Sequence, residues 1–499
     1  MVRADRRSAL LDAAESRAVD RRSIEEGGVS GAALMAAAAA GAARVVRGRF
    51  PRARRVVVVA GSGHNGGDGF EVGRLLHQAG RTVTILRVAS RPSAGDSAAT
   101  LAAAIAAGVP VYEESDGSIE RYLADADLVV DALLGTGATG APTGGVAAAI
   151  RCINAAKLPV VALDIPSGVD ASTGEAPGEA ISATVTPTFH AAKVGLRVMP
   201  GLLHSGTVIV IPIGALAGPA GRVLSANRHT IVRPSRQRSG SKYDAGVVVV
   251  VGGSEGMSGA PAMAAAAALR AGAGLAIALV PAAVAHLVAA RHAEVMVHGL
   301  SDAGDLPALA QRATALVIGP GSGRAGGADD VLRAALALNL PTVIDADALW
   351  WLACDPTLLA GRTAATVLTP HAGEAARLLG VTAADIANHR LNSAQTIAQQ
   401  SSAVCILKGA DTLIAAPDGR LAVRAGDSPA LATAGTGDVL AGLVGALLAQ
   451  GADAFEAACA AVVIHLEAAC VAAAQRGGAI MAGDLIGHLS VSAQPGSTT

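Results

Sequence analysis

Hydrophobic positions along this chain are gathered in short continuous runs rather than in an alternating pattern. The runs are rich in valine, isoleucine and leucine, and stretches rich in alanine and leucine separate them. Continuous apolar runs are typical of strands whose sheet is covered on both faces. Strands that alternate with helices predict an α/β fold with parallel sheets. The predicted strands lie at residues 56–60, 82–88, 127–133 and 159–165 in the first half, and at 247–253, 315–321, 342–348, 366–370 and 404–409 in the second.

The length of the chain and one polar segment near its middle predict two domains. A chain of 499 residues is too long for one ordinary hydrophobic core. Residues 214–240 are rich in Gly, Pro, Ser and Arg, which is typical of a domain boundary. We therefore expect domains at residues 1–222 and 223–499. The two ends, up to about Ala9 and from about Val491, are expected to be disordered.

Composition argues against several classes of partner. The formal net charge is -1 and only 2% of residues are aromatic, so neither a basic surface nor stacking platforms for nucleic acid are expected. The most apolar stretch, around Ala260 to Ala290, is broken by Arg270 and several glycines, so we expect no membrane span. Five cysteines lack the spacing of a zinc or disulfide framework. These features predict a cytoplasmic protein without nucleic-acid or membrane partners.

Three predicted strand ends in the first half carry chemically marked segments. GSGHNGGDG (61–69) directly follows a strand and precedes a helix expected to start near Phe70. Glycines let a backbone approach phosphate, and a helix N-terminus attracts anions. DALLGTG (131–137) and DIPSG (164–168) follow two further strands. Because the carboxyl ends of parallel strands meet at one edge of a sheet, the three segments predict one site. No acid at the end of the next strand is placed to hold a ribose, which disfavours an ordinary NAD-dependent dehydrogenase.

The second half contains one strong signal, TAGTGDVLAGLVGALLAQG (433–451), and no P-loop motif. Small residues precede a long helix expected to begin near Asp438. Free amides at that helix start would stabilise developing phosphate charge, and Asp438 would be the base for a substrate hydroxyl. Helix capping explains Asp438 but not Gly435–Gly437 before it, so a phosphoryl-transfer site is favoured.

Further motifs carry a resemblance to known families. With VDRRSIEEGGVSGAALM (19–35) and TFHAAKVGL (188–196), the first half resembles the YjeF N-terminal family, the NAD(P)H-hydrate epimerases, over about residues 10 to 215. The loop before Asp438 resembles the ribokinase-like superfamily. Over about residues 230 to 490 the match narrows to the YjeF C-terminal family, the NAD(P)H-hydrate dehydratases, on the motifs GGSEGMSGAP (252–261), VIGPGSG (317–323), VIDADAL (343–349), LTPHAGE (368–374) and LKGADT (407–412). The resemblance implies an N-terminal Rossmann-like three-layer domain and a C-terminal ribokinase-like α/β domain.

In the epimerase half, the resemblance implies a substrate cradle, an ion and a pair of proton-transfer residues. The implied substrate-binding residues are His64, Asn65, Gly66, Gly67, Asp68, Gly135, Thr136, Gly137, Ala138, Thr139, Gly140, Ala141 and Asp164. A potassium ion is implied on oxygens of Asn65, Asp131 and Ser167, and oxygen ligation suits such a hard cation. Asp164 and Lys193 are the implied catalytic pair, because inversion at a carbon needs groups that give and take protons. His64 and Gly140 stand where the family commonly has Asn and Arg.

In the dehydratase half, the resemblance implies a pocket for the hydrated nicotinamide and a nucleotide site. The implied pocket residues are Ala260, Gly321, Gly323, His371 and the catalytic Asp438. The implied nucleotide-binding residues are Lys408, Gly409, Ala410, Asp411, Thr412 and Gly437. Glu374 is expected to help order Mg²⁺ through water. Asp345 and Asp347 rank below these residues, with helix capping as the alternative.

Together the two halves predict repair of hydrated nicotinamide nucleotides. The first would epimerise (R)- and (S)-NAD(P)HX. The second would dehydrate (S)-NAD(P)HX to NAD(P)H at the expense of ADP or ATP, giving AMP or ADP and phosphate. The expected ligands are K⁺, Mg²⁺, an adenine nucleotide and NADHX or NADPHX, and a homo-oligomer is expected. Two alternatives stay open: a ribokinase-like vitamin or sugar kinase with a Rossmann-like accessory domain, and a first half that is only a binding or scaffolding module.

Overall fold

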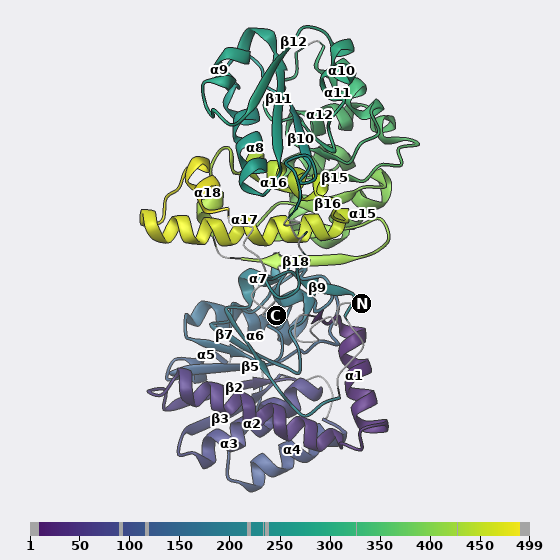
Figure 1. Cartoon of the computed structure of the whole chain (residues 1–499). Coiled ribbons are helices and arrows are strands. Elements are labelled where there is room, and N and C mark those ends of the chain that lie inside the picture. The colour runs from purple at the N-terminus through teal and green to yellow at the C-terminus, as the bar shows by residue number, and fades with distance from the viewer. Residues whose placement is uncertain are drawn as a thin grey trace. The chain divides into compact units, whose positions relative to one another are not determined.

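The chain divides into two compact units. The computed structural model describes residues 9–88, 93–114, 119–216, 221–232, 234, 239–325, 327–426 and 428–489. The units are Met1–Leu224 and Ser225–Thr499, coloured purple to teal and teal to yellow in Figure 1. The boundary expected after residue 222 falls close to this division. Apart from Ala9, the ends that were predicted to be disordered lie outside the described residues.

In the first unit, strands and helices alternate along most of the chain. The elements are β1 (Ala9–Leu10), α1 (Ala13–Glu25), α2 (Gly31–Arg49), β2 (Arg55–Ala60), α3 (His64–Gln78), β3 (Thr82–Arg87), α4 (Gly95–Ala106), β4 (Val111–Glu113), α5 (Ile119–Leu123), β5 (Leu128–Ala132), α6 (Gly144–Ala156), β6 (Val160–Ala162), β7 (Val185–Phe189), the 3₁₀ turn η2 (Val194–Leu196), α7 (Gly201–His204), β8 (Thr207–Ile211) and β9 (Val223–Ser225).

Seven of these strands form a parallel sheet with helices on both faces. Its order is β4-β3-β2-β5-β6-β7-β8. Val56 and Val58 of β2 pack in one core with residues of α2, α3 and α4, whereas Val57 and Val59 pack in another with residues of α5 and α6. This confirms the predicted three layers. Strand order reverses between β2 and β5, the position where such sheets bind ligands.

Helix α3 begins earlier than the sequence pattern predicts. We expected a start near Phe70, but the helix starts at His64, so the glycine-rich segment forms its first turns. A Cβ atom on Gly66 would lie 2.0 Å from the Gly61 carbonyl oxygen, and one on Gly69 would lie 2.5 Å from the Ala132 Cβ. These glycines therefore let α3 start directly against the sheet.

The second unit contains the remaining elements. They are β10 (Val247–Val251), α8 (Gly259–Arg270), β11 (Leu275–Pro281), η3 (Ala282–Val284), α9 (Ala285–Ala289), β12 (Met296–Leu300), η4 (Ala303–Asp305), α10 (Leu306–Leu309), β13 (Ala315–Ile318), α11 (Ala328–Ala337), β14 (Thr342–Ile344), α12 (Asp347–Cys354), η5 (Pro356–Leu359), β15 (Thr366–Leu368), α13 (Ala372–Leu379), α14 (Ala383–Asn388), α15 (Arg390–Ser401), β16 (Val404–Leu407), β17 (Asp411–Ala415), β18 (Leu421–Ala425), η6 (Pro429–Leu431), α16 (Thr436–Ala449), α17 (Ala454–Arg476) and α18 (Ala482–His488).

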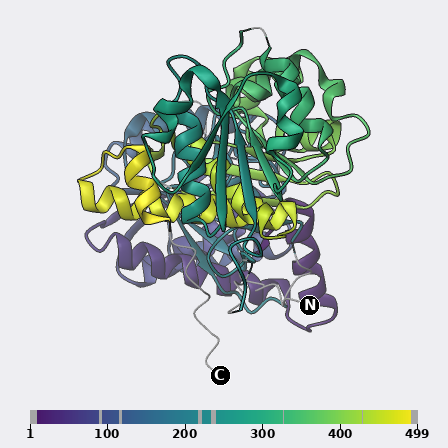
Figure 2. The ribbon, with the colours of Figure 1, turned by 45° about the horizontal axis from the view of Figure 1, so that its top comes forward.

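The strands of this unit follow the order β18-β17-β16-β15-β14-β13-β10-β11-β12. Pairing is parallel from β16 through to β12, and β17 and β18 are antiparallel. Helices α8 and α16 pack on each other and on β10, and the strands run side by side in Figure 2. Each of the nine predicted runs contains a strand. The α/β class and its parallel sheets are confirmed.

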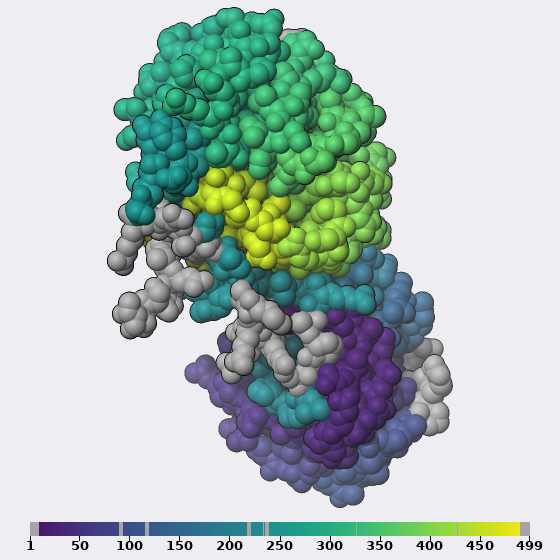
Figure 3. All heavy atoms as spheres, turned by 45° about the vertical axis from the view of Figure 1, so that its right-hand side comes forward, coloured from purple at the N-terminus to yellow at the C-terminus, as the bar shows by residue number. Residues whose placement is uncertain are grey.

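Among the described residues, one helix is long and apolar enough to cross a membrane by length and composition. It is α17, with a mean hydropathy of 2.0, and not the stretch at 260–290 that the sequence pattern singled out. Of its most apolar window, 72% is buried inside the structure, as in a core helix. In Figure 3 the yellow atoms of this C-terminal region lie among green and teal atoms of the same unit.

Candidate active sites

In the first unit, buried oxygens gather where β2, β5 and β6 end. The Ser167 hydroxyl donates to Asp131 Oδ1 at 2.6 Å, and the Ser167 amide donates to Oδ2 at 2.9 Å. Asn65 Nδ2 donates to the Leu134 carbonyl at 2.7 Å. The backbone amide of Leu134 donates to Ser167 Oγ at 2.9 Å. Asn65 Oδ1 is buried and accepts no hydrogen bond from the described residues. Burial raises the pKa of Asp131 to about 6, although the Ser167 hydrogen bonds act to lower it. An unused amide oxygen beside a buried carboxylate fits an oxygen-bound cation.

Lys193 and Asp164 form a hydrogen-bonded ion pair in the same unit. Lys193 Nζ donates to Asp164 Oδ1 at 2.5 Å, to Thr188 Oγ1 at 3.1 Å and to the Phe189 carbonyl at 2.9 Å. The Lys193 side chain is 3% exposed and that of Asp164 is 14% exposed. Asp164 has a φ of 65°, the left-handed region that Asp and Asn adopt more readily than most residues. The backbone after β6 therefore turns this carboxylate towards the lysine.

Asp68 adds a second carboxyl group to this pair. It is buried in α3, and burial raises its pKa well above the usual value, with the Asp164 and Asp20 carboxylates adding to the effect and Lys193 opposing it. Asp20 on α1 was not predicted as a site residue, although it stands in the quoted segment 19–35. A cationic lysine thus lies close enough to several carboxyl groups to influence their protonation.

The predicted cradle of this unit is partly assembled. Asn65, Gly66, Gly67 and Asp68 are buried in the first turns of α3, whereas His64 at the helix start is exposed. A Cβ atom on Gly135 would lie 3.0 Å from the Asn65 Cβ, so the start of the predicted loop meets α3. Later loop positions are mostly exposed, namely Gly137, Thr139, Gly140 and Ala141, with Thr136 and Ala138 half-buried.

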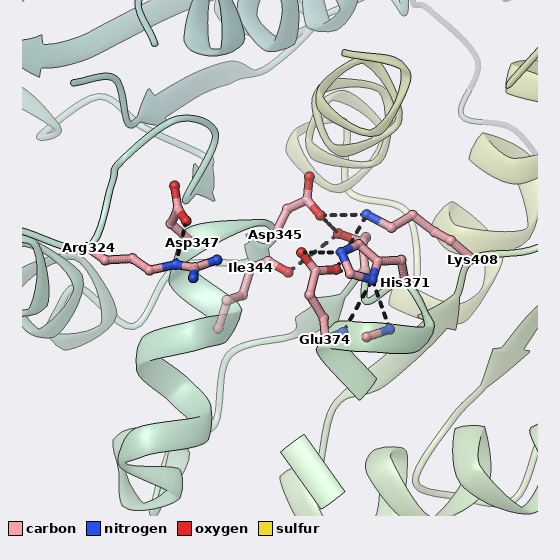
Figure 4. Close-up of polar contacts among 9 residues, drawn as sticks. Arg324, Ile344, Asp345, Asp347, His371, Glu374 and Lys408 are labelled. Atoms are coloured by element: carbon pink, nitrogen blue, oxygen red, sulfur yellow. Dashed lines mark hydrogen bonds and ion pairs between the residues drawn. The ribbon is translucent and has the colours of Figure 1, made fainter. Parts of the chain in front are cut away.

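In the second unit, Lys408 lies among acidic side chains at the carboxyl ends of the parallel strands. Its Nζ donates to Asp345 Oδ1 at 3.0 Å and lies 3.9 Å from Glu374 Oε2. The Thr369 hydroxyl also donates to Asp345 Oδ1, at 2.6 Å. Figure 4 shows Lys408 pointing towards Asp345, with His371 and Glu374 alongside. Burial acts to lower the pKa of Lys408, but the Asp345 and Glu374 carboxylates outweigh it and raise that pKa.

Asp345 is more central than its sequence pattern indicated. It is 1% exposed, and its partners are a lysine and a threonine rather than the amides of a helix start. The alternative interpretation of Asp345 as a helix cap is therefore wrong. Asp347 opens α12 but accepts from the Gly323 amide at 3.0 Å and from Arg324 Nε at 3.2 Å, so it holds the loop after β13.

Asp438 lies in the first turn of α16, two residues after its start at Thr436. Burial raises the pKa of Asp438 to about 7, with Asp345 adding to the effect and Lys408 opposing it. A Cβ atom on Gly437 would lie 3.4 Å from Lys408 Nζ, so this turn passes next to the lysine. Gly435 has a φ of 88°, which favours glycine, and precedes the helix. A carboxyl group that titrates near neutrality at a helix N-terminus suits a general base beside an anion site.

The predicted nicotinamide pocket brings three small residues together. A Cβ atom on Gly321 would lie 3.2 Å from the Ala260 Cβ, and one on Gly323 would lie 3.3 Å from Ser254 Oγ. Ser254 Oγ donates to the Gly321 carbonyl at 2.8 Å. A side chain at Gly321 would therefore collide with Ala260.

His371 lies at the start of α13, and its side chain is exposed. Its Nδ1 accepts from the Gly373 amide at 3.0 Å, which leaves the proton of the neutral ring on Nε2. Partial burial and the nearby Lys408 lower the pKa of His371. Burial raises the pKa of Glu374, which accepts the His371 amide at 2.8 Å. His371 thus presents a neutral N–H donor.

The predicted nucleotide loop forms the turn between β16 and β17. Thr412 Oγ1 donates to the Gly409 carbonyl at 2.9 Å, and Gly409 and Ala410 are exposed. Asp411 differs from its neighbours, because its side chain is 0% exposed and forms an ion pair with Arg390. Arg390 had no motif in the sequence that would have singled it out.

Two family models match the chain. One, described as the YjeF-related protein N-terminus, matches residues 31–195, and the other, described as NAD(P)H-hydrate dehydratase, matches residues 248–490. The bifunctional NAD(P)H-hydrate repair enzyme of Moorella thermoacetica is 39% identical, covering 96% of each chain. This chain belongs to the bifunctional NAD(P)H-hydrate repair enzymes. The Escherichia coli member is 38% identical over 89% of this chain and 86% of its own length.

Solved structures also resemble the second unit of this repair enzyme. The ADP/ATP-dependent NAD(P)H-hydrate dehydratase of Bacillus subtilis, co-crystallised with ATP and Mg²⁺, is 26% identical. The match covers 54% of this chain and 96% of that one, with a TM-score of 0.45. The two family models and the Moorella thermoacetica relative confirm, at the level of the family, the resemblance predicted from the sequence. The individual residue assignments stay predictions.

Proposed function

We propose that the two units of this repair enzyme carry one activity each. The first interconverts (R)- and (S)-NAD(P)HX, and the second converts (S)-NAD(P)HX to NAD(P)H while ADP or ATP is split to AMP or ADP and phosphate. The observation that carries the proposal is the arrangement of Asp438 and Lys408 around the first turn of α16. A base and a cation at a helix N-terminus suit the transfer of a phosphoryl group to a hydroxyl.

In the second unit, Asp438 is the base for the hydroxyl at C6 of the hydrated ring. It takes the hydroxyl proton as that oxygen attacks the terminal phosphorus of the nucleotide, and the bond to the bridging oxygen breaks. Lys408 and the amides before Asp438 stabilise charge on the phosphate. The bond between C6 and the phosphate oxygen then breaks and phosphate leaves. The neighbouring ring carbon loses a proton to solvent, and the electrons of that C–H bond form the ring double bond. Phosphate is the better leaving group, so this elimination is easier than direct loss of water. His371, whose Nε2 lies 3.4 Å from Glu374 Oε1, would contact the bound ring.

Magnesium would join the second unit with the nucleotide. No group of three or more His, Cys, Asp or Glu side chains in the described ranges is arranged to hold a metal ion. Mg²⁺ usually keeps several waters and binds substrate phosphates with few protein ligands. Glu374, half-buried beside Lys408, would order its waters. The ion would neutralise phosphate charge.

In the first unit, Asp164 and Lys193 would move the protons that inversion at C6 requires. Because Lys193 donates directly to Asp164, a proton can pass between the two side chains. Asn65, Asp131 and Ser167 would hold potassium, as the unused Asn65 Oδ1 supports. The ion would supply positive charge beside the cradle at Asp68 and Gly135.

The test uses purified full-length chain and a mixture of NADHX epimers. Added ADP or ATP should restore the near-ultraviolet absorbance of NADH and release one phosphate for each NADH formed. A stable phosphorylated product without that absorbance would instead indicate a kinase. Homo-oligomerisation, a cytoplasmic location and the choice between ADP and ATP stay predictions, and the same assay with each nucleotide decides the last.

A further inference from the structure

A buried arginine ties together the main chain on both sides of the predicted nucleotide loop. Arg390 opens α15 and is 6% exposed. Its Nε donates to Asp411 Oδ2 at 2.9 Å and lies 2.7 Å from Oδ1. Its Nη2 donates to the carbonyls of Leu407 at 3.4 Å and Lys408 at 3.3 Å. One guanidinium therefore joins the last residue of β16 and the residue after it to the first residue of β17.

The turn between these strands is shaped around the guanidinium. Asp411 is 0% exposed, and a buried carboxylate is strongly destabilising without a cationic partner. A Cβ atom on Gly409 would lie only 2.4 Å from Arg390 Nη2. Arginine can donate in several fixed directions at once, which the single ammonium of lysine cannot reproduce. Neither the arginine nor the glycine is therefore readily exchanged.

Lys408 is the residue that this arrangement places. Its carbonyl is held by Arg390, while its Nζ reaches Asp345 and the first turn of α16. We propose that Arg390 is a positioning residue for the nucleotide, fixing the turn through Asp411 and two carbonyls so that Lys408 meets the phosphates. Asp411 acts through the same pair rather than by touching the nucleotide. The proposal rests on the proposed function of the second unit.

The direct test is Arg390→Lys in the full-length chain. The Kd for ADP and ATP should rise about tenfold, the size expected when hydrogen bonds to a charged group are lost. The KM for the nucleotide should rise with it, while the KM for NADHX stays unchanged. The rate of epimerisation in the same chain reports that the first unit is intact.

A matched control is available in Arg362→Lys. Arg362 is a half-buried arginine of the same unit and donates to the Leu336 carbonyl at 2.6 Å and to Thr366 Oγ1 at 2.9 Å. Its partners lie before β14 and at the start of β15, at the opposite ends of the strands from Lys408. This substitution should lower the melting temperature without changing nucleotide affinity.

A second variant tests the coupling within the turn. Gly409→Ala should weaken nucleotide binding in the wild-type background, because the new methyl group displaces the guanidinium. In the Arg390→Lys background, Gly409→Ala should reduce nucleotide affinity by much less. Fully additive effects would show that the two residues act independently and would overturn the proposal.

Nucleotide binding is measured by isothermal titration calorimetry, separately from turnover. An unchanged Kd in Arg390→Lys, or an equal loss of affinity in Arg362→Lys, would overturn the positioning role. If the wild-type chain binds nucleotide but dehydrates nothing, the proposed function fails and the role of Arg390 is still decided by the Kd values. A wild-type chain that binds no nucleotide overturns both.

Discussion

Each unit places one lysine among carboxyl groups at the carboxyl ends of parallel strands, but the two lysines use their protons differently. Lys193 donates three hydrogen bonds, to Asp164, Thr188 and Phe189, and its side chain is 3% exposed. Lys408 donates one hydrogen bond within the described part of its unit, to Asp345, and is 22% exposed. Since an ammonium has three donors, Lys408 retains N–H groups for a ligand. A lysine whose three N–H groups all donate to the protein suits proton exchange with its partner. A lysine with N–H groups left over suits phosphate binding.

The acids around the two lysines differ in the same sense. Asp438 stands at a helix N-terminus with a pKa raised to about 7, so it can accept a proton near neutral pH. Asp68 is buried, and burial raises its pKa well above the usual value, with the Asp164 and Asp20 carboxylates adding to the effect. These differences support the proposed roles, a general base in the second unit and a proton-sharing pair in the first.

The largest expected effect is that of Asp438→Asn. Asn has nearly the same size and keeps the first turn of α16 intact, but it cannot accept the hydroxyl proton. Dehydration should fall by about 10²- to 10⁴-fold, the usual cost of removing a general base. Epimerisation should be unchanged. Both rates are measured on one preparation, with its melting temperature as the folding control, and near-normal dehydration would remove Asp438 from its role.

The two lysines should respond differently to the same substitution. Lys193→Met leaves Asp164 without its partner, so it should destabilise the first unit by about 3–5 kcal/mol and abolish epimerisation. Lys408→Met should chiefly raise the nucleotide KM, because a phosphate contact is lost. Urea unfolding and nucleotide titrations of both variants distinguish the outcomes. A stability loss in Lys408→Met and a raised nucleotide KM in Lys193→Met would contradict the comparison.

The pH dependence of the two activities should differ. Dehydration needs deprotonated Asp438, so its rate should rise with pH through about 7 and fall about tenfold per unit below that. The same raised pKa makes the folded state bind a proton more tightly than the unfolded chain. Its stabilising contribution is therefore complete below pH 3.8 and is lost as the pH rises through about 7. Rate profiles of wild type and stability profiles of wild type and Asp438→Asn test both signs.

Potassium should matter to the first unit alone. Replacing it with a large organic cation should slow epimer exchange several-fold, because the Asn65 and Asp131 oxygens would lack their ion. Below pH 6 protons should compete with potassium, since the pKa of Asp131 is about 6. Exchange measured at several potassium concentrations and two pH values tests this. An exchange rate independent of potassium would count against the ion site.

Sequence patterns predicted the architecture and the chemically distinctive residues, because both leave short-range signals. Valine-rich runs predicted the strands they contain, and the glycines before Asp438 predicted a helix start. The six-residue error at α3 arose because glycine, a poor helix former in isolation, is required there by close packing on β2 and β5. Helix propensity, which depends on neighbouring residues in the sequence, carries no information on that contact.

Residues whose role depends on distant partners were missed or ranked too low. Asp345 resembles a helix cap in the sequence. In the sheet, β15 alone separates β14 from β16, and Lys408 reaches Asp345 across 63 positions of sequence. Arg390 resembles a surface residue at a helix start, and only the fold shows that it meets Asp411. Edge and hairpin strands such as β12 and β18 were also missed, because their apolar runs are short or interrupted.

The central claim is that each unit supplies the activity that the other lacks, and one recovery experiment tests it. Asp164→Asn keeps an oxygen for Lys193 and tolerates the φ of 65°, so it should fold yet lose proton transfer. With mixed NADHX epimers and excess nucleotide, wild type should restore all of the NADH absorbance. With the Asp164→Asn variant, recovery of absorbance should stop once (S)-NADHX is consumed. Adding the Asp438→Asn variant as a second protein should then carry the reaction to completion. Complete recovery by Asp164→Asn alone at the wild-type rate would contradict the account.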